Sequence, residues 1–361
     1  MYNIKTYQGY LIKLFLKNIL VITSIFAAIV FILNILEEIK FFSELSKSMY
    51  YPFFFTLLNL PSILFEIFPF IILISTQMFF LHLYNKDEVI IFKNYGVKNI
   101  DIIKILISIT FIFGIFLVFG FHTFSSSLKL NYLSFKNQFT DDNKYLAVIN
   151  ENGLWIKDEI NENINIINAE GIDGYNLKNI SISQMDKNYN FKKTIIAENI
   201  NISNKVWLLK NVKIFDVDGN KYDKSVMILD SNFDLEKINN LFSNLSSLNI
   251  FQLNSQLNDY KSLGYSTLDI ESYINKLIAI PVYLVIMILI GSILMLNTKH
   301  NHSKIFSIVV GILISVLIYY VNYFFNIMGT NERVPILLSV WFPLLILILL
   351  TSIGLIRINE K

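Results

Sequence analysis

The residues whose types best suggest recognition chemistry lie in a short segment, residues 87–97. Two acids come first, Asp87 and Glu88. The positive end of a helix dipole favours acidic side chains, so this pair predicts the start of a short helix. Gly96 follows about two turns later and is expected to end the helix, because glycine readily adopts the conformation that closes a C-terminus.

The same segment carries an apolar stripe. Val89, Phe92 and Tyr95 recur at a spacing of three and therefore share one side of the predicted helix. A helix this short cannot fold alone. It suits docking into a groove on another protein, and it equally suits resting on the lipid surface. Both interpretations stay open from these residues alone.

Other groups able to carry chemistry are few. Glu66 stands near the outer end of an apolar stretch, where a charge is functional by default, although capping of the turn before Pro69 explains it equally well. The chain has no cysteine and four histidines, so thiolate chemistry is excluded and no metal site is expected. The acids at 216–220 resemble a calcium loop, but Met227 occupies the position that needs a bidentate glutamate.

The elements that must position these residues are membrane spans. The chain is 54% hydrophobic with a mean hydropathy of +0.51, which is typical of an integral membrane protein. A net charge of +2 gives no argument for nucleic acid as a partner. Six stretches are apolar and long enough to cross a bilayer: residues 18–36, 62–84, 105–124, 277–296, 305–328 and 334–356. Residues 2–17 are either an interfacial helix or a plain extension of the first span.

Short-loop charges predict the orientation of these spans. Lysines cluster in the N-terminal segment, in the 85–104 loop, in the 297–304 loop and at the C-terminus, all on one side. The positive-inside rule places that side, with both termini, in the cytoplasm. The large polar region between the third and fourth spans then lies outside the cytoplasm.

That region, residues 125–271, reads as an all-β domain between two membrane halves, 1–124 and 272–361. Apolar residues alternate with polar ones, which places each pair on one face of a strand. The pairs are Ile164/Ile166, Ile180/Ile182, Ile200/Ile202 and Val212/Ile214. Turns are expected at Asn152–Gly153, Glu170–Gly171, Asp173–Gly174, 186–188 and 218–220, and a short helix near 251–257. The expected fold class is an α-helical polytopic membrane protein with six transmembrane helices, three on each side of an inserted all-β, jelly-roll-like domain.

A family resemblance rests on short motifs in a fixed order. They are Glu66-Ile-Phe-Pro69, the segment from Asp87 to Val97, Asn152-Gly-Leu-Trp-Ile156, Val206-Trp-Leu208, Ile250-Phe-Gln-Leu253, Ala279-Ile-Pro281 and Trp341-Phe-Pro343. In these motifs and their order the chain resembles the LptF/LptG permeases of the lipopolysaccharide-export ABC transporter. Within the family it is more similar to LptG, although Phe251 stands where tryptophan is expected.

The resemblance implies a set of partners. They are an LptF-like permease in a heterodimer, a dimer of an LptB-like ATPase, an LptC-like single-span protein and a periplasmic LptA-like bridge, with lipopolysaccharide as the substrate. The expected location is the bacterial inner membrane, with the β domain periplasmic. The chain has no phosphate-binding G-x-x-x-x-G-K-[ST] loop, so it is expected to be non-catalytic and to bind no cofactor. ATP and magnesium would be held by the partner ATPase.

The resemblance also assigns roles to residues. It implies that the 86–97 helix couples to the ATPase through Asp87, Glu88, Val89, Phe92, Tyr95 and Gly96, with Glu88 meeting a basic residue. A cavity for a phosphorylated, acyl-rich lipid needs apolar walls and a cationic rim. The expected substrate contacts are Phe26, Phe31, Lys40, Phe306, Tyr319, Tyr320 and Tyr323. Lys40 would pair with a phosphate or simply extend into the interface, and each aromatic residue would otherwise pack against helices or lipid.

Other functions explain less of the sequence. The paralogous LptF subunit is the nearest alternative to LptG. A mechanotransmission or receptor protein with an outer sensing domain would need a cytoplasmic output domain, and only loops and short termini are present. A membrane-embedded lipid enzyme would need clustered acids or histidines within the spans, and Glu66 with His122 forms no such cluster.

Overall fold

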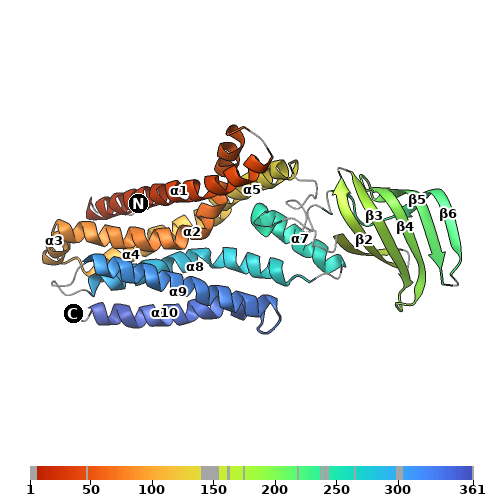
Figure 1. Cartoon of the computed structure of the whole chain (residues 1–361). Coiled ribbons are helices and arrows are strands. Elements are labelled where there is room, and N and C mark those ends of the chain that lie inside the picture. The colour runs from red at the N-terminus through yellow and green to blue at the C-terminus, as the bar shows by residue number, and fades with distance from the viewer. Residues whose placement is uncertain are drawn as a thin grey trace. The chain divides into compact units, whose positions relative to one another are not determined.

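The computed structural model describes residues 6–45, 48–139, 154–160, 163–173, 175–217, 219–235, 238, 244–263, 266–297 and 304–359. The chain divides into two compact units. One unit joins residues 1–128 to residues 268–361 and contains the apolar helices (Figure 1). The other is residues 129–267, and its described part contains a six-stranded antiparallel sheet. Within the described residues, six helices are long and apolar enough to cross a membrane, so the prediction of six spans around an inserted β domain is confirmed.

Several helices of the membrane unit are longer than a bilayer is thick. They are α1 (Thr6–Glu44), α2 (Tyr50–Asn85), α3 (Glu88–Asn94), α4 (Asn99–Phe116), a π-helical turn η1 (Leu117–Phe121), α5 (His122–Asn137), α8 (Leu268–Leu296), α9 (Lys304–Thr330) and α10 (Ile336–Asn359). Residues 6–17 belong to α1 itself, which runs unbroken from Thr6. The start of α1, the end of α10 and α3 lie at one end of the bundle (Figure 1).

Helix α8 forms the centre of the bundle. It packs against α2, α4, α9 and α10, whereas α1 packs mainly on α2. Small residues permit the closest approaches, as is usual where helices associate within lipid. A Cβ atom at Gly114 would lie 2.7 Å from the Cα atom of Pro281, and one at Gly291 would lie 3.1 Å from the Cβ atom of Thr76. Glycine at these positions therefore sets the spacing of α8 from α4 and α2.

The third span continues far beyond its predicted limit at residue 124. Helix α4 passes through the π-helical turn η1 into α5, which ends at Asn137. Helix α5 has little overall hydrophobicity, so a hydropathy criterion ended the span early. The backbone has no reason to stop there, because residues 122–137 contain neither glycine nor proline.

The inserted sheet is an antiparallel meander whose described strands follow sequence order. They are β1 (Leu154–Ile160), β2 (Asn163–Asp173), β3 (Asn176–Asp186), β4 (Phe191–Asn201), β5 (Val206–Asp216) and β6 (Lys221–Asp230). One face packs into a core that includes Ile180, Ile182, Ile200 and Ile202. A helix, α7 (Ile250–Leu263), follows the sheet where a short helix was expected.

Two details of the predicted β pattern are wrong. Glu170 and Gly171 do not form a turn but lie inside β2, where Gly171 pairs with Lys178 of β3. The core also takes Ile167 and Ala169 from β2 rather than Ile166. Strand β2 has apolar residues on both faces, so neighbouring strands rather than its own pattern decide which face is buried. The expected Asn152–Gly153 hairpin lies outside the described residues.

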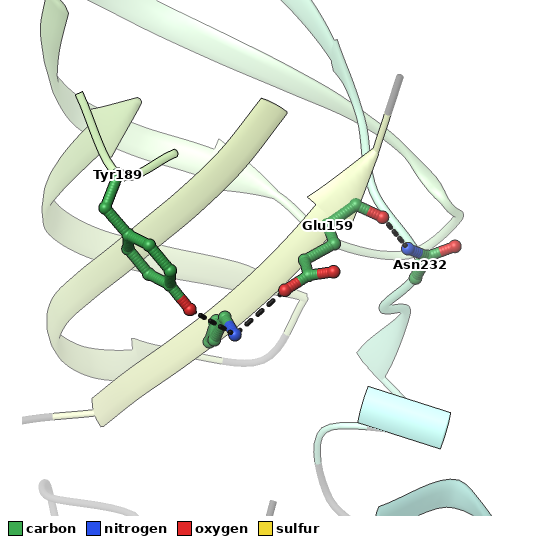
Figure 2. Close-up of polar contacts among 4 residues, drawn as sticks. Glu159, Tyr189 and Asn232 are labelled. Atoms are coloured by element: carbon green, nitrogen blue, oxygen red, sulfur yellow. Dashed lines mark hydrogen bonds and ion pairs between the residues drawn. The ribbon is translucent and has the colours of Figure 1, made fainter. Parts of the chain in front are cut away.

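The chain returns to the first strand after the last one. The buried Asp158 of β1 accepts a hydrogen bond from Ser231 Oγ at 2.8 Å and one from Asn232 Nδ2 at 2.9 Å. Asn232 also donates to the Glu159 carbonyl oxygen at 2.9 Å (Figure 2). The indole of the buried Trp207 donates to the Phe233 carbonyl oxygen at 2.8 Å. Residues 231–233 thus tie the last strand of the sheet to its first.

A polar contact links β1 to the β3–β4 turn. The Lys157 ammonium lies 2.8 Å from the Glu159 carboxylate and donates to the Tyr189 hydroxyl at 3.3 Å (Figure 2). The hydrogen bond to Glu159 is the main reason that the pKa of Lys157 is raised. Asp186 begins the same turn and accepts from the backbone amides of Asn188 and Asn190, at 2.8 Å each. Its pKa is lowered, chiefly by the hydrogen bond from the Asn190 side chain.

Candidate functional site

Helix α3 fills the turn between the second and third spans and has well-defined ends. Asp87 precedes it with a φ of 55°, and Glu88 is its first residue. At the other end Gly96 has a φ of 81°, which an L side chain rarely adopts. The Gly96 amide donates to the Lys93 carbonyl at 3.0 Å and the Val97 amide to the Phe92 carbonyl at 2.9 Å. This pair of bonds is a Schellman motif, so glycine is needed to end α3 here.

The side chains of α3 divide between the bundle and the outside. Val89 is buried, and Phe92 is half-buried with its ring 6.3 Å from that of Tyr7 on α1. Tyr95 is 84% exposed, and Ile91, one turn before it, is exposed as well. The stripe of Val89, Phe92 and Tyr95 expected from the sequence is therefore split, and Ile91 with Tyr95 forms the outward apolar surface.

Glu88 is held from within the chain. The hydroxyl group of Tyr10 lies 2.8 Å from Glu88 Oε1 and 2.9 Å from Oε2, so it donates to the carboxylate in a shared hydrogen bond. Together with the contact between Tyr7 and Phe92, this bond fastens the first turns of α1 to α3. Sequence reasoning missed Tyr10, because nothing in the local pattern relates residues 78 positions apart.

Three aromatic residues expected to contact substrate lie together on α9. The ring of Tyr319 lies 5.7 Å from that of Tyr320 and 6.5 Å from that of Tyr323, and all three side chains are exposed. Tyr319 also lies 6.4 Å from Phe70 of α2. Phe306 is exposed in the first turn of the same helix, about 20 Å along the axis from Tyr319. It does not belong to this tyrosine cluster.

The expected contacts on α1 are more dispersed. Phe26 is half-buried, and the half-buried Phe31 packs edge-on against Phe53 of α2 at 5.5 Å. Lys40 is exposed near the end of α1. Helices α1 and α9 are the least buried of the spans. In each, 22% of the residues in its most apolar stretch are buried, compared with 61% in α8. Both pack on α2, so two poorly covered apolar helices flank it.

A cavity of about 310 Å³ opens among α2, α8, α9 and α10. Glu66 lines it, as do Lys276, Tyr273, Asn322 and Asn326. Sequence reasoning selected Glu66 but missed the other four. Tyr273 and Lys276 precede residue 277, where the predicted fourth span began, and Asn322 and Asn326 lie inside the predicted fifth span without having been singled out. The available signal was a charged residue within a spanning helix, since Glu66 lies inside α2 and Lys276 about two turns after the start of α8.

The described residues form six spans in two sets of three, with a β domain inserted between the sets. This arrangement is that of a multi-pass membrane protein. The family model described as lipopolysaccharide export system permease LptF/LptG matches residues 9–357. The chain belongs to this family and is a multi-pass protein of the inner membrane, a permease subunit of a lipopolysaccharide export system. The family description covers both LptF and LptG. No curated protein matched the sequence in a separate comparison.

Proposed function

We propose that this chain is the LptG-type permease of an ABC transporter that extracts lipopolysaccharide from the inner membrane and passes it to a periplasmic bridge. The family match, which spans both membrane halves and the β domain, carries the assignment as a permease, and the choice of LptG rests on the sequence motifs alone. ATP would be hydrolysed by an LptB-like ATPase dimer at the end of the bundle that holds α3. An LptF-like permease, an LptC-like single-span protein and an LptA-like bridge complete the assembly.

The exposed surface of α3 supports a contact with the ATPase. Ile91 and Tyr95 give it an outward apolar surface, and Glu88 adds a carboxylate whose orientation is fixed by Tyr10. An apolar helix face with a positioned acid suits a groove that carries a basic residue. The lysine-rich short loops support a cytoplasmic location for this end of the bundle and a periplasmic one for the β domain.

The exposure of helices α1 and α9 supports the proposal that a partner permease lies beside them and that lipid passes between the two chains. Their exposed apolar side chains would face the partner across a lipid-lined space. The tyrosine cluster of α9 and Phe26 and Phe31 of α1 would form apolar walls, and Lys40 would meet a phosphate at the rim. Charge-assisted hydrogen bonds between lysine and phosphate are strong enough to orient a headgroup there.

Site-specific photocrosslinking tests the proposal. A crosslinkable residue at Tyr95 should capture an ATPase subunit, because this side chain points away from the bundle. The matched control is Phe116, which is exposed on α4 at 59% and should capture only lipid or another membrane chain. Glu88→Ala should additionally loosen the ATPase or uncouple ATP hydrolysis from lipid release. Lipid alone captured at Tyr95, in membranes that contain the ATPase, would contradict the proposed role of α3.

A further inference from the structure

The cavity among α2, α8, α9 and α10 has the composition of a lipid site. Its volume of about 310 Å³ falls at the lower end of the range for small-molecule pockets, roughly 300–1,000 Å³. Apolar side chains from three helices form much of its wall, among them Leu277, Ile280 and Leu344. Charged and amide groups occupy other parts of the lining. A ligand that fills it must therefore have both polar and apolar portions.

The charged groups lie at one depth in the membrane. Helix α2 ends at Asn85 and α8 ends at Leu296, both on the same side as α3 (Figure 1). At about 1.5 Å of rise per residue, Glu66 and Lys276 each lie about 28–30 Å from those ends. The hydrocarbon core of a bilayer is about 30 Å thick, so both charges are at the level of the lipid headgroups on the far side.

Polarity decreases from this level inward. Asn326 of α9 and Ser339 of α10 line the cavity near the ends of their helices that lie on the headgroup side. Leu344 lies further along α10, about 8 Å deeper. Asn322 lies between these levels, and Tyr283 places a hydroxyl group about 10 Å deeper than Lys276. The cavity thus carries its charged groups at the mouth and uncharged groups below them, in the same direction as a lipid of the leaflet on that side.

The charges at the mouth are mixed in sign. Glu66 and Lys276 are both exposed, although each belongs to a spanning helix. Lys276 has attractive electrostatic interactions with Glu66 and with Asp269, which is exposed two turns earlier on α8. Of these three groups, Glu66 and Lys276 line the cavity, one acid and one base. A headgroup with only negative charge would meet the Glu66 carboxylate as well as the Lys276 ammonium there.

We propose that this cavity binds a zwitterionic glycerophospholipid with a phosphoethanolamine headgroup. The phosphate would pair with Lys276, and the primary ammonium group would pair with Glu66. One acyl chain would run past Leu277 and Leu344, with ester carbonyls at the level of Asn322. This inference goes beyond lipopolysaccharide export, because the lipid is a resident of the bundle and not the exported molecule.

Native mass spectrometry of the full-length protein, in whatever assembly it is extracted, tests the inference. After delipidation, phosphatidylethanolamine, phosphatidylglycerol and lipid A are added back separately. We expect phosphatidylethanolamine to be retained at least tenfold more tightly than phosphatidylglycerol. Equal or tighter retention of phosphatidylglycerol or lipid A would overturn the proposal. Neither result depends on transport, so a failure here would leave the export function untouched.

Charge variants and a volume variant locate the lipid. Glu66→Gln should bring the two phospholipids to near parity, because it removes the partner of the ammonium group. Lys276→Gln should weaken retention of both lipids. Leu344→Trp should expel the lipid by filling the cavity, and Leu345→Trp is its matched control because Leu345 is 53% exposed and does not line the cavity. Identical lipid retention in Leu344→Trp and Leu345→Trp would place the lipid elsewhere and refute the assignment.

Discussion

Removal of one oxygen atom from Tyr10 should loosen α3 from the membrane bundle. In Tyr10→Phe the ring stays, and only the hydroxyl group that donates to Glu88 at 2.8 and 2.9 Å is lost. A hydrogen bond to a charged group contributes about 1.5–3 kcal/mol when it is well shielded. Tyr10 is 40% exposed, so water competes for the carboxylate. We therefore expect a loss of about 1 kcal/mol, which is less than the figure for a shielded bond.

That loss corresponds to a measurable change in local opening. About 1.4 kcal/mol is a factor of ten in an equilibrium constant, so about 1 kcal/mol is roughly fivefold. Amide hydrogen exchange reports such local opening directly. Peptides that cover residues 87–97 should exchange about fivefold faster in Tyr10→Phe, measured in detergent before any ATPase is added.

The matched control is Tyr7→Phe. Its ring lies 6.3 Å from the ring of Phe92, and the substitution keeps that contact. Exchange of residues 87–97 should therefore stay close to the rate of the unmodified protein. Unchanged exchange in Tyr10→Phe, or equal acceleration in both variants, would show that the bond to Glu88 does not hold α3.

Three further predictions concern packing and the β domain. Gly114→Ala should destabilise the protein in detergent by about 1–3 kcal/mol, because its Cβ atom would lie 2.7 Å from the Pro281 backbone. The control Gly9→Ala, with nothing within 4 Å, should be neutral or mildly stabilising. Equal melting temperatures of the two variants would argue against this helix contact. Asp158→Ala should destabilise the β domain by about 3 kcal/mol, since it leaves buried donors without an acceptor, and denaturant titration followed by tryptophan fluorescence measures this. Asp186 has a folded pKa below its ordinary 3.8, so its stabilising contribution is complete above that pH and is lost as the pH falls through the folded pKa. Asp186→Asn should flatten this acid-side dependence, and an unchanged pH profile of unfolding would assign the dependence to other groups.

Local patterns predicted the architecture well. Long apolar stretches identified all six spans, because the bilayer imposes a minimum length of apolar chain. Alternation identified buried residues of β3, β4 and β5, although Ile196 of β4 and Leu208 of β5 also place exposed apolar groups on the opposite face. Alternation did not predict the buried face of β2, since Ile164, Ile166 and Ile167 place apolar groups on both faces. The choice of face there depends on pairing with β1 and β3, which lies beyond any local window.

The contacts within the candidate sites were less accessible from sequence. The bond from Tyr10 to Glu88 joins residues 78 positions apart, and Glu66 and Lys276 line one cavity only because α2 and α8 pack side by side. Residue type did locate one partner of each pair, since an acid in or beside a membrane span is unusual. The second partner depends on helix packing, which hydropathy does not encode.

Because the second unit lies between the two parts of the membrane unit in the sequence, those two parts are synthesised at different times. The whole of the second unit, residues 129–267, must be made before the central helix α8 begins to appear. At roughly 5–20 residues per second, the ribosome needs about 7–28 s for this interval. Throughout it, the surface around Gly114, which finally packs against Pro281, has no α8 to cover it. The first three spans must therefore remain in the bilayer with an unfilled groove, and a membrane chaperone that occupies this groove would act in that window of seconds.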